Sequence, residues 1–532
     1  MAGSPDHKVD LSQAMVMEPV AVADWLVITP IIITIIGGSI CLMTRKNTAM
    51  QPWLGMGFLG LLVLSNIFLL RHVLDNGVVT MVMGRWLPPF GIAFTVDHVG
   101  ALLCLVASIV AFAGGYYAIA DIGKTQRRYG FFPFLLLLMT GVSGAFLTGD
   151  IFNLYVWFEV LLIASFGLII LGNEKIQIDG AVKYALLNLV ATTLFLIATG
   201  YVYGVFGTLN MADLAAQAAT VEDSVPLLTI GCLYVLAFTM KAAAFPVNFW
   251  LPASYHTPNI VVSAIFAGLL TKVGVYALLR VLIMILPGVR GEVTLVLTWI
   301  AGLTMVLGAL GALAQSDLRR MLGFLVISGI GAMFVGVAIG TTEAVSGAIL
   351  YAVHSIIVMT ALYLTVGIIA RICGETDMRK LGGLYRYDYG FAALFFVLML
   401  AISGLPPFSG FWPKVILVKA SLESEAEWLA FAILFSGFLT TLAMGRVWLH
   451  AFWRGGVEGI EDGVLAIPGK NARMAFGADD QRIMLAPLAG LVLLVIYLGL
   501  MPESVMSLAY QGAEGLNDPG AYIRSVFGEG GR

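Results

Sequence analysis

The sequence is poor in charge. Only 11% of its 532 residues are Asp, Glu, Lys or Arg, whereas 60% are hydrophobic. Soluble domains carry about 25% charged residues, and a soluble chain of this composition would leave large apolar patches facing water. A lipid bilayer accepts such surface. The composition therefore excludes an ordinary soluble protein and predicts an integral membrane protein.

Cysteine is scarce as well, and no two of the four cysteines have the CxxC spacing. This argues against iron–sulfur clusters and structural zinc, and we expect all four to be small buried apolar residues. No basic patch with interleaved aromatic residues is present, so we expect no nucleic-acid partner. The polar tail over residues 1–24 lacks the basic start of a signal peptide. We expect no cofactor.

Long apolar runs are abundant. A helix that spans a bilayer needs about 20 apolar residues. The runs of this kind predict an all-α integral membrane protein of about 14 transmembrane helices. They begin near Trp25, Trp53, Val96, Phe131, Ile151, Ala181, Val225, Asn259, Val293, Met321, Ala344, Gly390, Trp428 and Met484.

Lysine and arginine are unevenly divided between the loops. Most of them lie in loops that follow odd-numbered runs, such as Lys124, Arg127, Arg128, Arg319 and Arg320. Because loops rich in these residues stay in the cytoplasm, the odd-numbered loops are predicted to be cytoplasmic. Both termini are then predicted on the outer face of the membrane, which agrees with an even number of spans.

Several basic residues fall inside the predicted helices, where a lysine at mid-membrane costs about 2.5–3.5 kcal/mol on insertion scales. Arg280, Lys419 and Arg446 are close enough to helix ends to snorkel to the surface, whereas snorkelling and function are equally open for Lys183. Three lysines lie too deep for this: Lys241, Lys272 and Lys414. They are either members of structural salt bridges or functional groups, and three in one chain favour function.

Glu159 and His354 are the other interior candidates. Glu159 follows Asp150 in the chain and lies about 13 Å along the helix from it. At an effective dielectric near 20, a carboxylate attracts a lysine by about 4 kcal/mol at 4 Å and about 2 kcal/mol at 8 Å, so a small movement could load or release a proton. His354 could relay protons, since imidazole titrates near neutral pH; the alternative is a buried, hydrogen-bonded histidine.

Prolines interrupt two of the lysine-bearing segments. Pro246 follows Lys241, and Pro406 and Pro407 precede Lys414. Proline removes a backbone donor, so both segments are predicted to be broken helices. Paired broken helices are typical of transport sites near the membrane midplane, although kinks also occur without function.

A family resemblance is carried by three stretches of sequence. Two of them, KAAAFPVNFWLPASYHTPNIVVSAIFAGLLTKVGVYALLR (241–280) and QSDLRRMLGFLVISGIG (315–331), resemble signatures of the antiporter-like subunits of Mrp-type cation/proton antiporters and of the proton-pumping arm of respiratory complex I. The resemblance covers roughly residues 90–453. The third, GDIFNLYVWFEVLLIASFGLI (149–169), looks most like the D-type subunits of Mrp antiporters.

The resemblance implies a fold. It implies a core of 14 helices with two inverted five-helix repeats, helices 4–8 and 9–13, each with one broken helix. The chain would then divide into a tail (1–24), helices 1–3 (25–130), the first repeat (131–285), the second repeat (292–453), a cytoplasmic loop (454–483), and helix 14 with a C-terminal tail (484–532).

The resemblance also implies roles for residues. The expected proton relay is Glu159, Lys241, Lys272, His354 and Lys414. In this relay Glu159 pairs with Lys241, and Lys183 is a candidate modulator of that pair. Two positions depart from the family pattern: Gly329 replaces a histidine, and Val358 stands where some members carry a second lysine.

The implied function is that of a proton-translocating subunit in a multisubunit antiporter of the bacterial inner membrane, a secondary transporter and not an enzyme. Expected partners are a larger paralogous antiporter-like subunit, small membrane subunits, lipid, H⁺, and Na⁺ or K⁺. We expect no metal site, because hard cations need several oxygen ligands and the apolar runs hold no carboxylate cluster. Two alternatives stay open: a proton-pumping subunit of a redox complex such as complex I or a hydrogenase, and a scaffold whose buried charges only fix helix packing.

Overall fold

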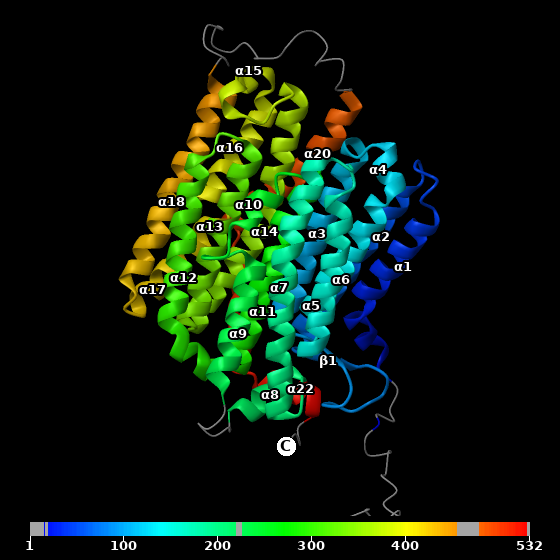
Figure 1. Cartoon of the computed structure of the whole chain (residues 1–532), viewed down its shortest axis with the longest axis vertical. Helices are drawn as coiled ribbons and strands as arrows, with labels where there is room; N and C mark the ends of the chain where they lie inside the picture. Colours follow the sequence, from blue (N-terminus) through cyan, green and yellow to red (C-terminus); the bar gives the residue numbers. More distant parts are fainter. Residues whose placement is uncertain (1–14, 16–19, 220–225, 455–477, 529–532) are drawn as a thin grey trace, which may run out of the picture.

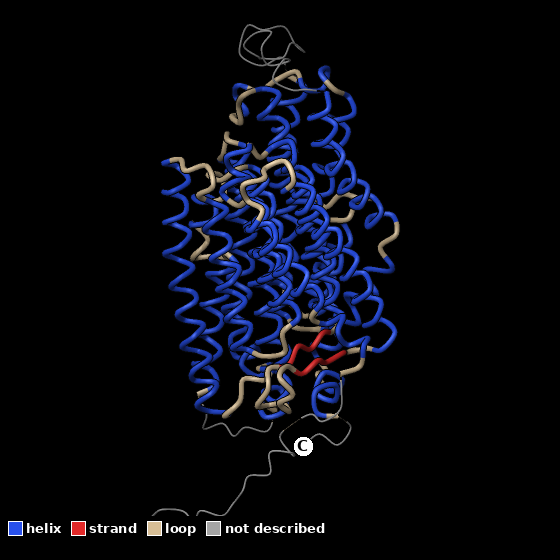
Figure 2. Tube along the Cα trace, turned by 90° about the vertical axis from the view of Figure 1, so that its right-hand side faces the viewer, coloured by secondary structure: helices blue, strands red, loops and turns tan. Residues whose placement is uncertain are grey.

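The computed structural model describes residues 15, 20–219, 226–454 and 478–528. Its helices run roughly along one axis, and two short strands lie at one end (Figure 2). Most of the predicted tail over 1–24 and of the predicted cytoplasmic loop over 454–483 lies outside the described residues.

Ten helices within the described ranges are long and apolar enough to cross a membrane. Two of them end in a π-helical segment, η3 (Leu279–Ile285) after α11 and η5 (Trp448–Trp453) after α18. The ten are α2 (Gln51–Asn76), α3 (His98–Asp121), α6 (Ile151–Ile169), α7 (Lys175–Phe206), α11 (Ile260–Leu278), α12 (Pro287–Ala314), α13 (Leu318–Ile339), α14 (Thr342–Cys373), α18 (Glu427–Val447) and α20 (Ala478–Leu500).

Four shorter apolar helices complete the bundle: α1 (Thr29–Met43), α5 (Phe131–Leu147), α9 (Leu227–Ala242) and α16 (Tyr389–Ser403). Each apolar run predicted from the sequence contains one of the long or short apolar helices. The prediction of an all-α integral membrane protein is therefore confirmed. The number of crossings and the inverted repeats stay predictions.

Short elements close the two ends of the bundle. One end holds η2 (Val22–Val27), the antiparallel strands β1 (Val79–Val82) and β2 (Ala93–Val96), α8 (Met211–Ala218), α21 (Glu503–Asn517) and α22 (Gly520–Phe527). The opposite end holds α4 (Lys124–Tyr129), η4 (Met378–Lys380) and α15 (Leu384–Tyr387). The dark-blue start of the described chain and the red α22 lie at the same end, opposite α4 and α15 (Figure 1). An even number of crossings requires this arrangement.

Two helices break where the prolines predict. After α9 ends at Ala242, the chain continues through Pro246 into the short α10 (Trp250–Ser254). After α16 ends at Ser403, it continues through Pro406 and Pro407 into α17 (Phe411–Glu423). From α9 to α10 the chain runs toward the end that carries α15, whereas from α16 to α17 it runs away from that end (Figure 1).

Two expectations about single residues are wrong. Arg280 does not snorkel: only 1% of its side chain is exposed, and its guanidinium lies 2.6 Å from the Asp97 carboxylate. Asp97 caps the N-terminus of α3, so the ion pair joins that cap to η3. Cys232, on α9, is exposed, whereas the other three cysteines are buried as predicted.

Candidate functional site

Lys241 lies in the last turn of α9, next to the first break, and is 4% exposed. Its ammonium donates a hydrogen bond of 2.9 Å to the hydroxyl of Thr192 on α7. That hydroxyl in turn donates to the carbonyl of Asn188 at 2.8 Å, which leaves its lone pairs free for the lysine. The Lys241 ammonium also lies 4.6 Å from the centre of the Phe158 ring, a cation–π contact. Both of these contacts of the Lys241 ammonium are with neutral groups.

Glu159 follows Phe158 on α6 and does not form the predicted ion pair. Within the described residues, no lysine or arginine nitrogen lies within 4.0 Å of its carboxylate, and its Oε1 atom is buried without a hydrogen-bond partner. The carboxylate is still close enough to attract the Lys241 ammonium electrostatically.

The break after Lys241 is held by side chains from other helices. Ala243 adopts a left-handed backbone with φ of 60° and ends α9. The backbone N–H of Phe245 donates to the Thr304 hydroxyl at 2.9 Å, and the Trp250 indole donates to the carbonyl of Met240 at 3.0 Å. Backbone groups freed at membrane depth need such partners. These hydrogen bonds stabilise the break and so fix the position of Lys241.

Lys272 lies in α11, the most completely buried of the long helices, and is 1% exposed. Its ammonium donates to the carbonyl of Ala267 in the same helix at 2.6 Å. Two residues further on, Gly274 packs against Ala242: a Cβ atom at Gly274 would come within 3.0 Å of the Ala242 nitrogen. The absence of a side chain there lets the helix that carries Lys272 approach the first break.

His354 lies near the middle of α14 and is 3% exposed. Its Nδ1 atom lies 2.9 Å from the hydroxyl of Ser409, which belongs to the second break; which atom donates depends on the tautomer. A Cβ atom on the adjacent Gly410 would come within 2.8 Å of the imidazole Cε1 atom. The second break therefore packs directly on the histidine.

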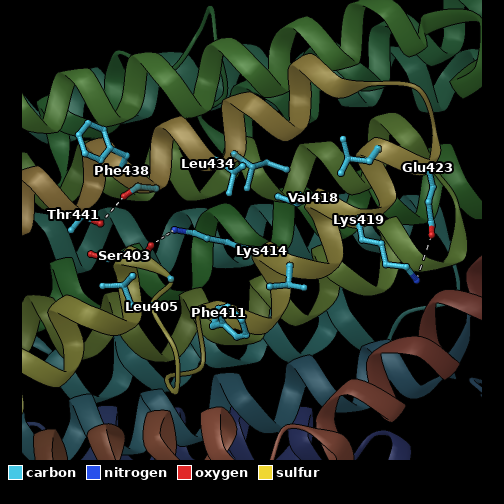
Figure 3. A pocket seen from close by; sticks show the side chains of 15 residues that line it. Ser403, Leu405, Phe411, Lys414, Val418, Lys419, Glu423, Leu434, Phe438 and Thr441 are labelled. Atoms are coloured by element: carbon cyan, nitrogen blue, oxygen red, sulfur yellow. Dashed lines mark hydrogen bonds and ion pairs between the residues drawn. The ribbon is translucent and has the colours of Figure 1, made fainter.

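Lys414, in the first turn of α17, reaches back to the end of α16. Its ammonium donates to the carbonyl of Ser403 at 2.8 Å (Figure 3). It also donates to the carbonyl of Ile402 at 3.3 Å. A cation at a helix C-terminus satisfies its last carbonyls and complements its dipole. Lys414 also lines a groove of about 770 Å³ between α17 and α18, whose other walls are largely apolar. Both broken helices thus end their first half beside a lysine, which is buried at Lys241 and partly buried at Lys414.

The candidate residues follow a continuous series of packed helices. α6 packs on α7 and α7 on α9; α11 packs on both α9 and α14, and α14 packs on α17. No hydrogen bond within the described residues joins one of the five relay candidates directly to another. The three lysines and His354 have hydroxyls or backbone carbonyls as hydrogen-bond partners instead. A proton would need water or side-chain movement to pass between neighbouring groups.

Lys183 lies apart from this series. On the exposed face of α7, its ammonium pairs with Asp179 at 2.5 Å, and about half of its side chain is accessible. This pair is with a residue of its own helix, one turn away, and not with Glu159. Its role as a modulator stays a prediction.

Sequence reasoning missed the hydroxyl partners Thr192 and Ser409. A signal for Thr192 exists: Tyr184, Asn188 and Thr192 recur every four residues, which puts polar groups on one face of an otherwise apolar helix. Ser409 has no comparable signal. No cluster of three or more His, Cys, Asp or Glu side chains that could hold a metal ion occurs in the described part of the chain.

The fold and the site together define a multi-pass membrane protein with buried lysines that neutral groups hold in its interior. Its sequence matches the family model described as NADH:quinone oxidoreductase/Mrp antiporter, TM, over residues 148–440. The chain belongs to this family, as the sequence motifs predicted.

Individual relatives cover nearly the whole chain. It is 39% identical to the D-type subunit of the Na(+)/H(+) antiporter of Alkalihalophilus pseudofirmus, over 95% of this chain and 99% of that one. It superposes with a TM-score of 0.85 and 27% identity on a chain of the Mrp complex from Dietzia sp., covering 95% of this chain and 100% of the other. A chain of respiratory complex I from Thermus thermophilus shares the fold, with a TM-score of 0.77 and 24% identity over 92% and 99% of the two chains.

Proposed function

We propose that this chain is the proton-translocating subunit of a multisubunit monovalent cation/proton antiporter in a bacterial inner membrane. Protons pass along Glu159, Lys241, Lys272, His354 and Lys414, and their influx drives the efflux of Na⁺ or K⁺. The names of its relatives support the antiporter assignment. The neutral hydrogen-bond partners of Lys241, Lys272 and Lys414 support the proton path.

One observation carries the proposal. Within the described ranges, no carboxylate lies within 4.0 Å of Lys241, Lys272 or Lys414, and each donates to a hydroxyl or carbonyl instead. Lysines retained only for packing would be paired, because an unpaired buried charge strongly destabilises a fold. A lysine with neutral partners can release and regain a proton without breaking an ion pair.

Glu159 supplies the movable charge in this scheme. Its buried Oε1 atom has no partner, so the carboxylate is free to approach Lys241 or to withdraw from it. Approach stabilises the charged lysine, and withdrawal favours release of its proton toward Lys272 on the neighbouring α11. At an effective dielectric near 20 the attraction changes by about 2 kcal/mol between 4 and 8 Å, which is enough to bias a proton transfer.

We infer that the end of the bundle with both termini faces outward. The opposite end carries the basic residues of α4, η4 and α15. Loops rich in lysine and arginine stay in the cytoplasm. The described part of the chain holds no cluster of three or more His, Cys, Asp or Glu side chains that could bind a metal cation. The cation path therefore involves partner subunits, among them a larger antiporter-like paralogue and small membrane subunits.

Alanine replacements test the relay. Glu159→Ala and Lys241→Ala are each expected to abolish cation-dependent dequenching of a pH dye in inverted vesicles, while the complex still assembles on size-exclusion chromatography. Lys46→Ala, which removes an exposed loop lysine, is the control and should leave antiport unchanged. Full activity in both interior variants would overturn the assigned roles.

The structural likeness to a chain of respiratory complex I favours a second candidate, a proton-pumping subunit of a redox complex. The membrane chemistry would be nearly the same. The two candidates differ in their partners: a redox complex carries iron–sulfur clusters or flavin, whereas an antiporter complex needs neither. An absorbance spectrum of the purified native complex therefore separates them.

A further inference from the structure

A second hollow opens at the end of the bundle that carries η2, α21 and α22 (Figure 1). It has a volume of about 720 Å³ and lies between α14, α17 and the start of α21. Its rim holds an ion pair of 2.8 Å between Glu343 on α14 and Lys419 on α17. Both side chains are partly exposed, at 30% and 58%, so this rim lies at the surface of the chain.

From this rim, matching faces of two helices lead inward. On α14, Glu343, Ser346, Leu350 and His354 are spaced three or four residues apart, which puts them on one face of the helix. On α17, Lys419, Ile416 and Trp412 share a face in the same way. Glu343 and His354 are about 16 Å apart along the helix axis. The result is a funnel with polar groups at both ends and apolar groups between them.

The funnel narrows at Trp412. A smaller cavity beyond it is lined by His354, Ser409, Leu350 and Val353, and it shares Trp412 and Pro502 with the outer hollow. This inner cavity offers about 10 Å³, close to the least that holds one water molecule. The Trp412 indole donates to the carbonyl of Gly499 in α20 at 2.9 Å, which holds the ring across the passage. Apolar constrictions of this kind close a path by excluding water.

We propose that this funnel connects the outer face of the membrane with the proton path of this subunit, with Trp412 as its gate between the outer hollow and the Ser409–His354 pair. The inference rests on the proposed function, since it concerns the outer end of the same proton path. When the indole leaves Gly499 and swings toward the hollow, water enters the inner cavity. The Ser409 hydroxyl then passes a proton between that water and His354.

Thiol accessibility tests the route without relying on transport. Leu350→Cys is introduced into the complete complex, with the exposed Cys232 replaced by serine. A membrane-impermeant, charged methanethiosulfonate is added to the outside of sealed right-side-out vesicles, so that it meets the outer face of the cell membrane. The rate of modification is expected to be low, and to rise by about tenfold or more when Trp412→Ala is added, because the rate follows the population of the open gate.

Three controls accompany this measurement. Ser507→Cys, in the wide part of the hollow, should react fast with or without the Trp412 change. Ile356→Cys, buried on another face of α14, should stay unreactive. Trp428→Ala removes a tryptophan that packs on Trp299 away from the funnel, and should not speed the modification of the Leu350→Cys thiol.

The outcomes are decisive in either direction. A Leu350→Cys rate that Trp412→Ala leaves unchanged, or modification only from the opposite face, would overturn the gate. If the Trp412→Ala complex does not assemble, Trp412→Phe is read in the same way, since it removes the indole bond to Gly499. Lys241→Ala should leave the labelling pattern intact. If Lys241→Ala shows normal antiport and Leu350→Cys still reacts faster with Trp412→Ala, only the proposed function is refuted. If Trp412→Ala does not change the reaction of Leu350→Cys, only the funnel is refuted.

Discussion

The ammonium of Lys241 donates a hydrogen bond of 2.9 Å to the hydroxyl of Thr192, and this contact joins α9 to α7 beside the first break. A hydrogen bond to a charged group is worth about 1.5–3 kcal/mol. Thr192→Val keeps the shape and removes the acceptor, so we expect antiport to fall by about tenfold or more. Thr192→Ser keeps the hydroxyl and should retain most of the activity in the same vesicle assay. Equal activity of both variants would show that the contact is incidental.

The variant Lys272→Met tests whether this lysine relays protons or only fixes the packing of the helices. Methionine has a similar length and no charge, so packing is preserved while proton binding is lost. We expect the complex to assemble with near-normal thermal stability and to show no antiport by pH-dye dequenching. Intact transport in this variant would support a purely structural role for the buried charge.

The buried ion pair of Arg280 and Asp97 should contribute more to stability than an ion pair on the surface. Their side chains are only 1% and 5% exposed, and removing one partner of such a pair costs about 3–5 kcal/mol. Asp97→Asn is expected to lower the apparent Tm of the detergent-purified complex markedly. Asp75→Asn, which breaks the exposed Arg71–Asp75 pair, is the matched control and should change stability by about 1 kcal/mol or less. Similar shifts in the two variants would contradict this assignment.

Gly410 predicts a steric effect on the second break. A Cβ atom there would lie 2.0 Å from the carbonyl oxygen of Ala401 and 2.8 Å from the His354 ring. Gly410→Ala must therefore push the break away from the histidine, and we expect reduced antiport together with a lower Tm. Gly445→Ala, at a glycine with open space around it, should change neither. Wild-type behaviour of Gly410→Ala would mean that the break adapts freely.

The bundle and its breaks follow from local sequence. Apolar runs of spanning length have few alternatives in a membrane, because each must satisfy its own backbone hydrogen bonds. Pro246, Pro406 and Pro407 stop the helical ladder wherever the rest of the protein lies. These features depend on neighbouring residues alone, so they could be predicted without coordinates.

The partners of the charged groups could not be predicted in this way. Arg280 was expected to reach the membrane surface, but Asp97, 183 residues away in sequence, holds it inside. Glu159 was expected to pair with Lys241, but Phe158 and Thr192 occupy the space around the ammonium. Such contacts depend on which helix faces come together, and hydropathy carries no information about that rotation.

Tyr522 connects α22 to the buried Arg280–Asp97 pair. Its ring lies 5.3 Å from the Arg280 guanidinium, and α22 packs on β2 and α8 beside the buried ion pair. The helix α22 therefore helps to cover the buried Arg280–Asp97 pair at this end of the bundle. Displacing α22 would uncover this pair, so a change that loosens the contact of α22 with β2 and α8 would also weaken the ion pair at the start of α3.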